Sequence, residues 1–341
     1  MSAFKKLVRA TEWIQRKFSS RGLILMYHRV ANQDVDPWAM CVSPEHLGEQ
    51  LEVLQKETHP VSLGQLVQSH RNGKIPDRAV AVTFDDGYAD NLHSAKPLLD
   101  RYGIPATVFV VSGHIGNERE YWWDELERII LRPATIPETL SLWIQDKTFK
   151  WESGEAAKYS RNKPERDSCW IINRQENHNL RHSLYFTLHQ LLQPLSEAER
   201  RKVMDELFAW AGVSHSKRSN YRTLTHTELL NLSQGELIEV GAHTVTHPFL
   251  SVLPYSSQQD EIQRGKNILE ESIGRQIRSF SYPYGNYTME TVAIVRKSGY
   301  DCACSVSKDS VWRGSDLFQL PRITIEDWGG EEFRQRLLEW I

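Results

Sequence analysis

The sequence predicts an α/β protein whose parallel strands close into a barrel, interrupted by a long and mostly helical insertion. Short apolar segments of the kind that form buried strands alternate with amphipathic helical segments, both before residue 115 and after residue 222. The strands number about eight, which favours a (β/α) barrel over an open sheet. Between these two positions the alternation stops, and the chain becomes polar and rich in tryptophan.

The first half of the barrel is predicted from three strands and the helices between them. Residues 22–27, 79–84 and 104–111 are short, predominantly apolar segments of the kind that form buried strands. Between the first two segments, Ser43 and Pro44 are typical of a helix N-cap and of the first helical position. The leucines that follow recur with helical spacing: Leu47, Leu51 and Leu54. This alternation predicts parallel strands with helices packed outside them.

The insertion and the second half of the barrel are predicted in the same way. Helical patches such as 123–131 and 197–210 indicate that residues 115–222 are largely helical and are carried by the main fold. The alternation then returns, with helices expected at 225–232, 258–273 and 288–298 and strands at 237–241, 279–282 and 302–305. We therefore expect a barrel over residues 22–341 with the insertion inside it.

Composition argues against some classes of partner. A net charge of −3, a pI near 6.5 and the lack of a basic tail give no indication of nucleic-acid binding. No stretch is long enough to span a bilayer. The cysteines lack the C-x-x-C spacing of metal or redox sites, so we expect reduced thiols and a cytoplasmic protein. They are Cys41, Cys169, Cys302 and Cys304.

Residues 1–21 are a local exception to the even charge of the chain. Six Lys and Arg against one Glu give six minus one, or +5, and apolar residues recur at helical spacing. One face of the predicted helix is therefore apolar and the other basic. No apolar core of a secretory signal follows. Such a helix packs on the body of the protein, or it lies in a membrane interface. The second option would hold the protein at the inner membrane face through residues 1–20.

Two adjacent acids, Asp85 and Asp86, directly follow the predicted strand at 79–84. Like charges in one site repel, so a metal ion, an arginine or water must accompany them. His243 and His247 follow another predicted strand, and their spacing lets two imidazoles converge on one ion. One carboxylate and two imidazoles leave open positions on a divalent ion, beside which the second carboxylate acts as a base.

A third segment, residues 279–287, ends another predicted strand with Pro283 and a glycine, residues that also mark ordinary turns. Together the three segments resemble the motifs of the polysaccharide deacetylase family (NodB-homology domain, carbohydrate esterase family four). TFDDG at 83–87 is similar to the first motif, HTVTH at 243–247 to the second, and YPYG at 282–285 to the third.

The resemblance covers about residues 22–115 and 223–330 and leaves the insertion outside it. The LMYHRV segment at 25–30 is also similar to the start of the exopolysaccharide-type branch of the family. The resemblance implies a distorted (β/α) barrel. It also implies a metal-dependent hydrolase that removes acetyl groups, N-acetyl groups in particular, from a saccharide or glycan precursor in cell-envelope or exopolysaccharide metabolism.

The resemblance also assigns roles to individual residues. Asp85 is similar to the family's catalytic base, and Asp86, His243 and His247 match its metal ligands. Zinc is the expected ion, although this donor set suits several divalent ions. The implied chemistry is that the metal polarises the acetyl carbonyl and makes its water more acidic, while Asp85 takes the proton.

The third motif and nearby aromatic residues give the expected substrate contacts. The family pattern places an oxyanion against the backbone N–H of Tyr284, next to Pro283. Tyr88, Tyr287 and Trp328 are expected either to stack on pyranose rings or to pack in the core, and so is the ring of Tyr284.

Two positions depart from the family pattern. Where an arginine commonly orients the base, this chain has Ser281, and Arg322 in a late predicted strand is the candidate substitute. The alternative for this arginine is a surface salt bridge. The usual C-terminal histidine is missing, because no histidine follows His247. His28 is the candidate general acid, since imidazole titrates near neutrality, and His114 is a second candidate.

Two other functions stay open at this point. The metal site could hydrolyse a non-sugar amide or imide, or the protein could be a saccharide-binding protein that has lost catalysis. The adjacent acids argue against the second, because binding alone gives no reason to retain them. Trp122 and Trp123 head the insertion, where they pack a helical subdomain or form a lid or shelf for a saccharide.

Overall fold

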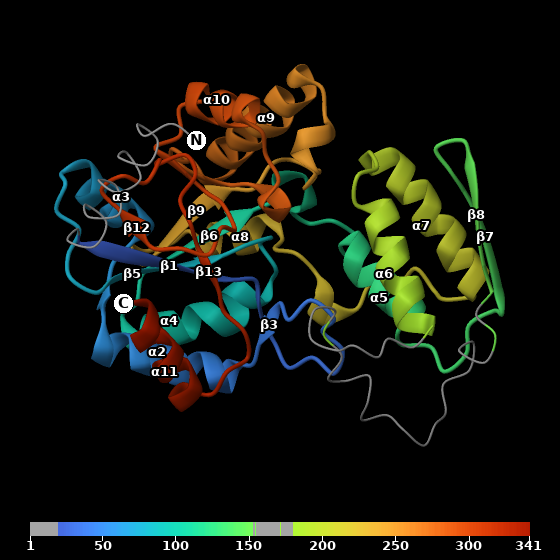
Figure 1. The fold of residues 1–341 in the computed structure, drawn as a ribbon, viewed down its shortest axis with the longest axis horizontal. Helices are drawn as coiled ribbons and strands as arrows, with labels where there is room; N and C mark the ends of the chain where they lie inside the picture. Colours follow the sequence, from blue (N-terminus) through green and yellow to red (C-terminus); the bar gives the residue numbers. More distant parts are fainter. Residues whose placement is uncertain (1–19, 153, 155–170, 172–179) are drawn as a thin grey trace, which may run out of the picture.

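The computed structural model describes residues 20–152, 154, 171 and 180–341, and Figure 1 shows their fold. The predicted amphipathic helix at 1–21 lies outside the described residues except for its last two positions, so it stays a prediction. Among the helices that are described, none is both long and apolar enough to cross a membrane.

Six parallel strands form the centre of the molecule. Their neighbours pair in the order β1-β5-β6-β9-β10-β11. Their bounds are β1 (Arg21–Tyr27), β5 (Ala79–Phe84), β6 (Ala106–Val110), β9 (Ile238–Ala242), β10 (Ser279–Ser281) and β11 (Cys302–Cys304). Two short strands extend the sheet. They are β4 (His59–Pro60), parallel to β5, and β12 (Val311–Trp312), antiparallel to β1.

The segment that leads into β13 (Ile323–Thr324) brings the two sides of this sheet together. Leu320 forms a parallel bridge with Cys304 of β11, and Ile323 pairs with Leu25 of β1. The segment thus spans the gap between β11 and β1, and the sheet curls into a distorted barrel. This confirms the predicted α/β barrel.

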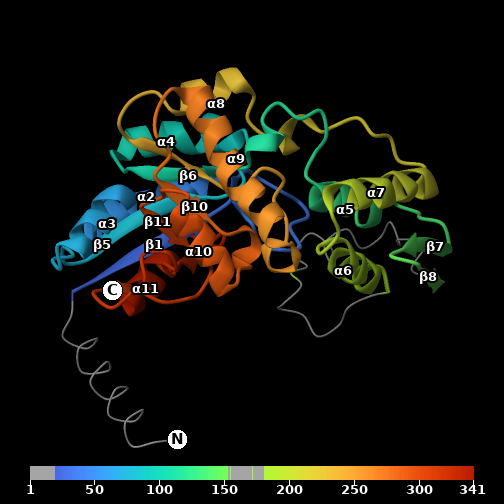
Figure 2. The same cartoon turned by 90° about the horizontal axis from the view of Figure 1, so that it is seen from above.

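Helices surround the barrel, as Figures 1 and 2 show from two directions. In α2, Ser43 is the N-cap and accepts a hydrogen bond from the backbone N–H of His46, with Pro44 at the first helical position, as predicted. The predicted leucine stripe of α2 is fully buried. The helices are α2 (Pro44–Glu57), α3 (Leu63–Arg71), α4 (Lys96–Tyr102), α8 (His226–Leu232), α9 (Tyr255–Ile273), α10 (Met289–Lys297) and α11 (Gly330–Trp340).

Several short elements complete the barrel. The strands β2 (Arg29–Val30) and β3 (Cys41–Val42) pair with each other, and η1 (Asn91–Ala95) is a π-helical turn before α4. The 3₁₀ turns are η2 (Ser112–His114), η5 (Ser219–Tyr221), η6 (Leu250–Val252) and η7 (Pro283–Gly285).

The insertion forms a second body with its own apolar core, at the right of Figure 1. Its helices α5 and α7 correspond to the predicted helical patches. It also contains an antiparallel hairpin, which the sequence analysis did not predict. One face of the first hairpin strand is buried, through Leu140, Leu142 and Ile144. The elements are α5 (Trp122–Ile130), β7 (Thr139–Ile144), β8 (Lys147–Glu152), α6 (Leu180–Leu192) and α7 (Glu197–Ala211).

The cysteines that the structure describes are free thiols, as expected. Cys41, Cys302 and Cys304 are buried and form no disulfide, whereas Cys169 lies outside the described residues. Burial raises the pKa of the Cys304 thiol to about 12, so this side chain is an apolar packing residue at neutral pH.

Candidate active site

The polar residues predicted to carry chemistry meet at the carboxyl ends of the barrel strands. Asp85 and Asp86 directly follow β5, and His243 directly follows β9. Ser281 is the last residue of β10, and Arg322 directly precedes β13. Parallel strands end at the same face of a barrel, which is why segments far apart in the sequence meet here.

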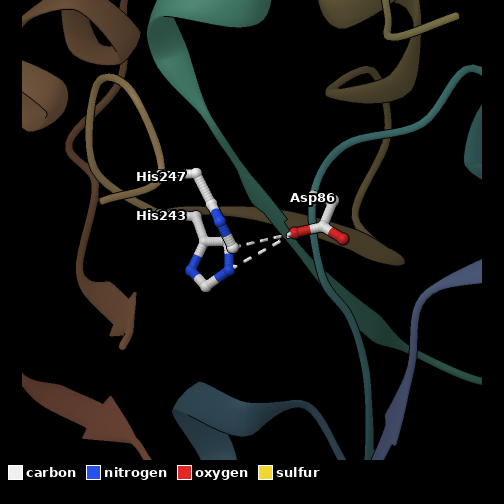
Figure 3. Close-up of side chains that lie close together, drawn as sticks. All are labelled: Asp86, His243 and His247. Carbon is white, nitrogen blue, oxygen red and sulfur yellow. Dashed lines mark ion pairs between the residues drawn. The ribbon is translucent and has the colours of Figure 1, made fainter. Parts of the chain in front are cut away.

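Asp86, His243 and His247 form a buried cluster in which both imidazoles point at the carboxylate (Figure 3). The Oδ1 atom of Asp86 lies 3.3 Å from Nε2 of His247 and 3.5 Å from Nε2 of His243. Two ligand atoms that are each about 2.1 Å from a tetrahedral ion lie about 3.4 Å apart. The two separations from Asp86 therefore match those expected around one ion of this size.

Hydrogen bonding prepares His243 to act as a ligand. Its Nδ1 atom lies 2.7 Å from the carbonyl oxygen of Ser281. Because a carbonyl only accepts, Nδ1 carries a proton, and Nε2 is the ring nitrogen that faces Asp86. Burial lowers the pKa of His247 to about 4, so this imidazole is neutral at pH 7. One carboxylate oxygen and two imidazole nitrogens that converge in a buried site form a donor set suited to a divalent ion.

Asp85 has a different partner, the fully buried Arg322. The two guanidinium Nη atoms each donate to one carboxylate oxygen at 2.7 Å. Burial alone raises the pKa of Asp85, but the charge of Arg322 and its hydrogen bonds outweigh burial and hold this pKa below its ordinary value. Asp85 is therefore an anion, oriented by a bidentate pair.

All five N–H donors of Arg322 have acceptors, and Ser281 is among them. Nη2 donates to the Ser281 hydroxyl at 2.8 Å, and that hydroxyl donates to Asp85 at 3.2 Å. Nη1 also donates to the Thr83 hydroxyl, and Nε donates to the backbone oxygen of Ser305. A serine at position 281, where the resembled family commonly has an arginine, is small enough to share the site with the guanidinium of Arg322, which precedes β13. Arg322 is a buried partner of Asp85, not part of a surface salt bridge.

His28 lies beside this pair of acids. It directly follows β1, it is half-buried, and its backbone oxygen accepts a hydrogen bond of 2.9 Å from the Asn91 side chain. It is close enough to interact electrostatically with both Asp85 and Asp86. The second candidate acid, His114, is buried and stacks on Tyr121, and burial lowers its pKa to about 4. Of the two histidines, only His28 retains access to solvent.

The third motif and the insertion together border the cluster of Asp86, His243 and His247. The ring of Tyr284, beside Pro283 in η7, lies 4.4 Å from the His247 ring, centroid to centroid. Trp123 lies 4.9 Å from the same histidine, and Trp122 donates a hydrogen bond to the Tyr284 hydroxyl at 3.3 Å. The sequence indicated that these tryptophans belong to the insertion, but not that they contact a metal ligand.

Of the two alternatives given for Tyr88 and Trp328, the structure shows core packing, so their place among the substrate contacts is corrected. Tyr88 is 0% exposed; its hydroxyl donates to Asp124 at 2.6 Å and accepts from the Trp123 indole at 2.9 Å. Trp328 is 8% exposed and packs in the core beneath the Arg336 guanidinium. Neither ring has a face free for a pyranose, so packing accounts for both. The ring of Tyr287 stacks against Tyr282 at 4.3 Å.

Left-handed backbone conformations also gather at this site. Eight described residues other than glycine have positive φ, and four of them belong to the site: Asp86 (73°), Thr244 (66°), His247 (57°) and Tyr284 (57°). Each such residue costs about 1–3 kcal/mol and persists only where its surroundings hold it. Concentration of this strain at one cluster is typical of a functional site.

Comparison with known families gives one match. The family model for polysaccharide deacetylase matches residues 72–138 and 214–303. The interval between the two matched segments lies within the predicted insertion. The match thus includes both aspartates, both histidines and the third motif, and ends before Arg322.

Among curated proteins, the poly-β-1,6-N-acetyl-D-glucosamine N-deacetylase of Staphylococcus aureus (strain MSSA476) is 34% identical over 280 residues, covering 82% of this chain and 64% of the relative. The enzyme of the same name from Escherichia coli (strain K12) is 36% identical over 84 residues, covering 24% of this chain and 12% of the relative. The chain therefore spans less than two thirds of the length of these curated relatives.

Among solved structures, IcaB from Ammonifex degensii matches with a TM-score of 0.57 at 17% identity, covering 94% of this chain and 96% of that one. The Streptococcus pyogenes deacetylase PplD in complex with acetate matches with a TM-score of 0.55 at 17% identity, covering 94% of this chain and 98% of that one. At this identity the likeness shows the fold alone, which both proteins share with this chain.

Proposed function

Because this chain belongs to the polysaccharide deacetylase family, we propose that it is a metal-dependent hydrolase that removes acetyl groups, N-acetyl groups in particular, from a saccharide or glycan precursor. The S. aureus relative is named for poly-β-1,6-N-acetyl-D-glucosamine, which makes an N-acetylated glucosamine polymer the first substrate to try. We place this activity in cell-envelope or exopolysaccharide metabolism.

The observation that carries the proposal is that two adjacent buried acids have different partners. Asp86 faces two imidazoles, whereas Asp85 forms a bidentate pair with Arg322. A protein that only bound saccharide would have no use for two buried carboxylates with different partners, each of which costs free energy to desolvate. Separate environments for two acids are typical of a site in which one binds a metal and the other transfers protons.

Asp86, His243 and His247 would hold the ion, and two imidazoles with one carboxylate form a three-ligand set used by catalytic zinc sites. When bound, a divalent ion supplies a Lewis acid that polarises the acetyl carbonyl and makes water more acidic. Zinc is our proposal for its identity, because two imidazoles with one carboxylate are a zinc donor set and the two separations from Asp86 match zinc–ligand bond lengths.

Asp85 would act as the general base. The pairing with Arg322 keeps its carboxylate ionised and fixes its orientation, so that it takes a proton from the attacking water without first losing one itself. The backbone N–H of Tyr284 would donate to the oxyanion that forms on the acetyl carbon, next to Pro283.

His28 would act as the general acid. A leaving amine must be protonated as the C–N bond breaks, and an imidazole with access to solvent both supplies and regains a proton near neutral pH. His28 is the half-buried histidine next to Asp85 and Asp86, which suits this role.

We further propose that the protein is cytoplasmic and contacts the inner membrane face through residues 1–20. This proposal rests on the basic and apolar residues of that segment. Cosedimentation with liposomes of anionic lipid tests it. Binding by the full chain that is lost on deleting residues 1–20 supports it, and no binding by the full chain rules it out.

Acetate release tests the proposed activity. Protein stripped of metal is incubated with N-acetylated and O-acetylated glucosamine oligosaccharides, before and after Zn²⁺ is restored. We expect acetate from the N-acetylated substrates only when Zn²⁺ is present. Acetate from no saccharide, by protein that binds Zn²⁺, would contradict saccharide deacetylation and favour hydrolysis of a non-sugar amide or imide.

A further inference from the structure

The turn that joins the two metal-ligand histidines is strained. Thr244 and His247 both have left-handed backbone conformations, with φ of 66° and 57°. β-branched residues such as threonine rarely adopt this conformation. A turn of this kind keeps its shape only if its surroundings hold it there.

A carboxylate from α9 binds this turn from one side. The Oε2 atom of Glu261 accepts hydrogen bonds from the backbone N–H groups of Val245 and Thr246, both at 2.9 Å. Its Oε1 atom accepts from the Thr246 hydroxyl at 2.8 Å. A single side chain thus satisfies both central amides of the turn, in the manner of an anion bound by successive backbone N–H groups.

The loop after β6 binds the turn from the other side. Ser112 N–H donates to the backbone oxygen of Thr244 at 3.1 Å, and Gly113 N–H donates to that of Val245 at 2.9 Å. Within the turn, His247 N–H donates to the Thr244 hydroxyl at 3.0 Å. Four of the six backbone N–H and C=O groups of residues 244–246 therefore have protein partners, which leaves the turn little freedom to relax.

Close packing of α9 against the turn brings the Glu261 carboxylate within hydrogen-bonding distance of the backbone N–H groups of the turn. Gly265 lies one helical turn after Glu261 and on the same face. A Cβ atom at Gly265 would lie 3.0 Å from the carbonyl carbon of Thr244 and 3.1 Å from its oxygen. A larger residue would push α9 away from the turn and lengthen the hydrogen bonds of Glu261.

We infer that Glu261, with Gly265, is a positioning residue of the metal centre, holding His243 and His247 in ligand geometry before an ion arrives. The inference rests on the metal centre proposed above. Groups that orient metal ligands without touching the ion typically change metal affinity by about 10–100-fold when they are removed. Glu261 acts through backbone amides of the turn, not through a ligand side chain.

The test measures the affinity of the full chain for Zn²⁺, by calorimetry with a competing chelator, and the visible absorption of the Co²⁺-loaded protein. Glu261→Ala should weaken Zn²⁺ binding by about 10–100-fold and alter the Co²⁺ spectrum, which reports coordination geometry. Glu261→Gln keeps the shape and an acceptor for both amides, so it should restore most of the affinity. Asp260→Ala is the matched control, because Asp260 is the adjacent acid on α9 and is exposed.

Thermal unfolding separates positioning from a role in stability alone. A residue that only stabilised the fold would lower Tm equally with and without Zn²⁺. A positioning residue also reduces the rise in Tm that Zn²⁺ produces, because that rise depends on affinity. If Glu261→Ala does not fold, Glu261→Asp is measured instead, since its shorter side chain should fail to reach both amides and weaken binding.

Each outcome decides between specific possibilities. Wild-type Zn²⁺ affinity and an unchanged Co²⁺ spectrum in Glu261→Ala, or in Glu261→Asp where that variant replaces it, would overturn the inference and leave the metal centre intact. Wild-type protein that binds no Zn²⁺ would contradict the metal centre itself, and the positioning role with it. Weakened binding that Glu261→Gln restores would establish the positioning role.

Discussion

Replacing Arg322 by alanine removes the partner of the proposed base from a fully buried site. Arg322 is 0% exposed and Asp85 is 3% exposed. Both carboxylate oxygens of Asp85 lose a 2.7 Å hydrogen bond from a cation, and among the described residues the longer bond from the Ser281 hydroxyl is what remains. The variant therefore contains a buried carboxylate without a countercharge from Arg322.

Removing one partner of a buried ion pair destabilises a protein by about 3–5 kcal/mol. Since the total free energy of unfolding of a domain is about 5–15 kcal/mol, the variant should fold but be markedly less stable. The matched control is Arg334→Ala. Arg334 is 43% exposed and pairs with Glu57 at 2.9 Å, and exposed pairs of this kind contribute about 0–1 kcal/mol.

The loss of stability should depend on pH, with a sign that the pKa of Asp85 sets. In the wild type this pKa lies below the ordinary 3.8, so Asp85 contributes stability above pH 3.8 that is lost as the pH falls through the folded pKa. In Arg322→Ala, burial acts without the arginine and raises the pKa. The stability difference between the two proteins should therefore be largest near neutral pH and should shrink in acid.

Urea denaturation of the metal-free proteins at neutral and acidic pH measures this difference. The acid limb of kcat/KM for acetate release gives a second measurement, and it should move to higher pH in Arg322→Ala because the base protonates more readily. Two results together would refute the role given to Arg322. The free energies of unfolding of the two proteins would differ by less than about 1 kcal/mol at every pH, as for an exposed pair, and the acid limb of kcat/KM would not move.

Three further changes have defined outcomes. Asp86→Ala should retain no Zn²⁺ after dialysis and release no acetate; full zinc content would remove this residue from the metal site. His28→Gln should lower kcat/KM for an N-acetyl substrate by about 10²–10⁴-fold. The decrease should be smaller for an O-acetyl ester, because its alkoxide leaving group depends less on protonation by an acid. Equal decreases for the two substrates would argue against His28 as the general acid. Trp123→Ala should reduce the free energy of unfolding by about 3–5 kcal/mol. The control is Trp143→Ala, whose side chain is 59% exposed and which should change this free energy by less than about 0.5 kcal/mol. Equal effects of the two substitutions would contradict the packing of Trp123.

The parts of the fold that sequence alone predicted are those with local signals. The run at 79–84 is apolar and β-branched, and every residue of the resulting strand is buried. The carboxyl end of that strand carries the acids, so the site followed from strand positions plus the barrel rule. Arg322 was predicted because this chain has Ser281 where the resembled family commonly has an arginine, so the prediction rested on the resemblance and not on a local pattern around Arg322.

The parts that sequence did not predict depend on contacts across the chain. The hairpin of β7 and β8 has alternating apolar residues, but they lie in a stretch whose stronger helical patches dominated the interpretation. The burial of Tyr88 depends on Asp124 and Trp123, which follow it by more than thirty residues. A single aromatic residue carries no sequence signal that separates a core ring from a sugar-stacking ring.

The most direct test of the proposed function compares acetate release by wild-type protein and by Asp85→Asn, with the Zn²⁺ content of each protein measured in the same samples. We predict that Asp85→Asn retains its zinc, because Asp86, His243 and His247 are intact, and that it loses acetate release from N-acetylated glucosamine oligosaccharides. A zinc-loaded Asp85→Asn protein that releases acetate at the wild-type rate would contradict the assignment of Asp85 as the base.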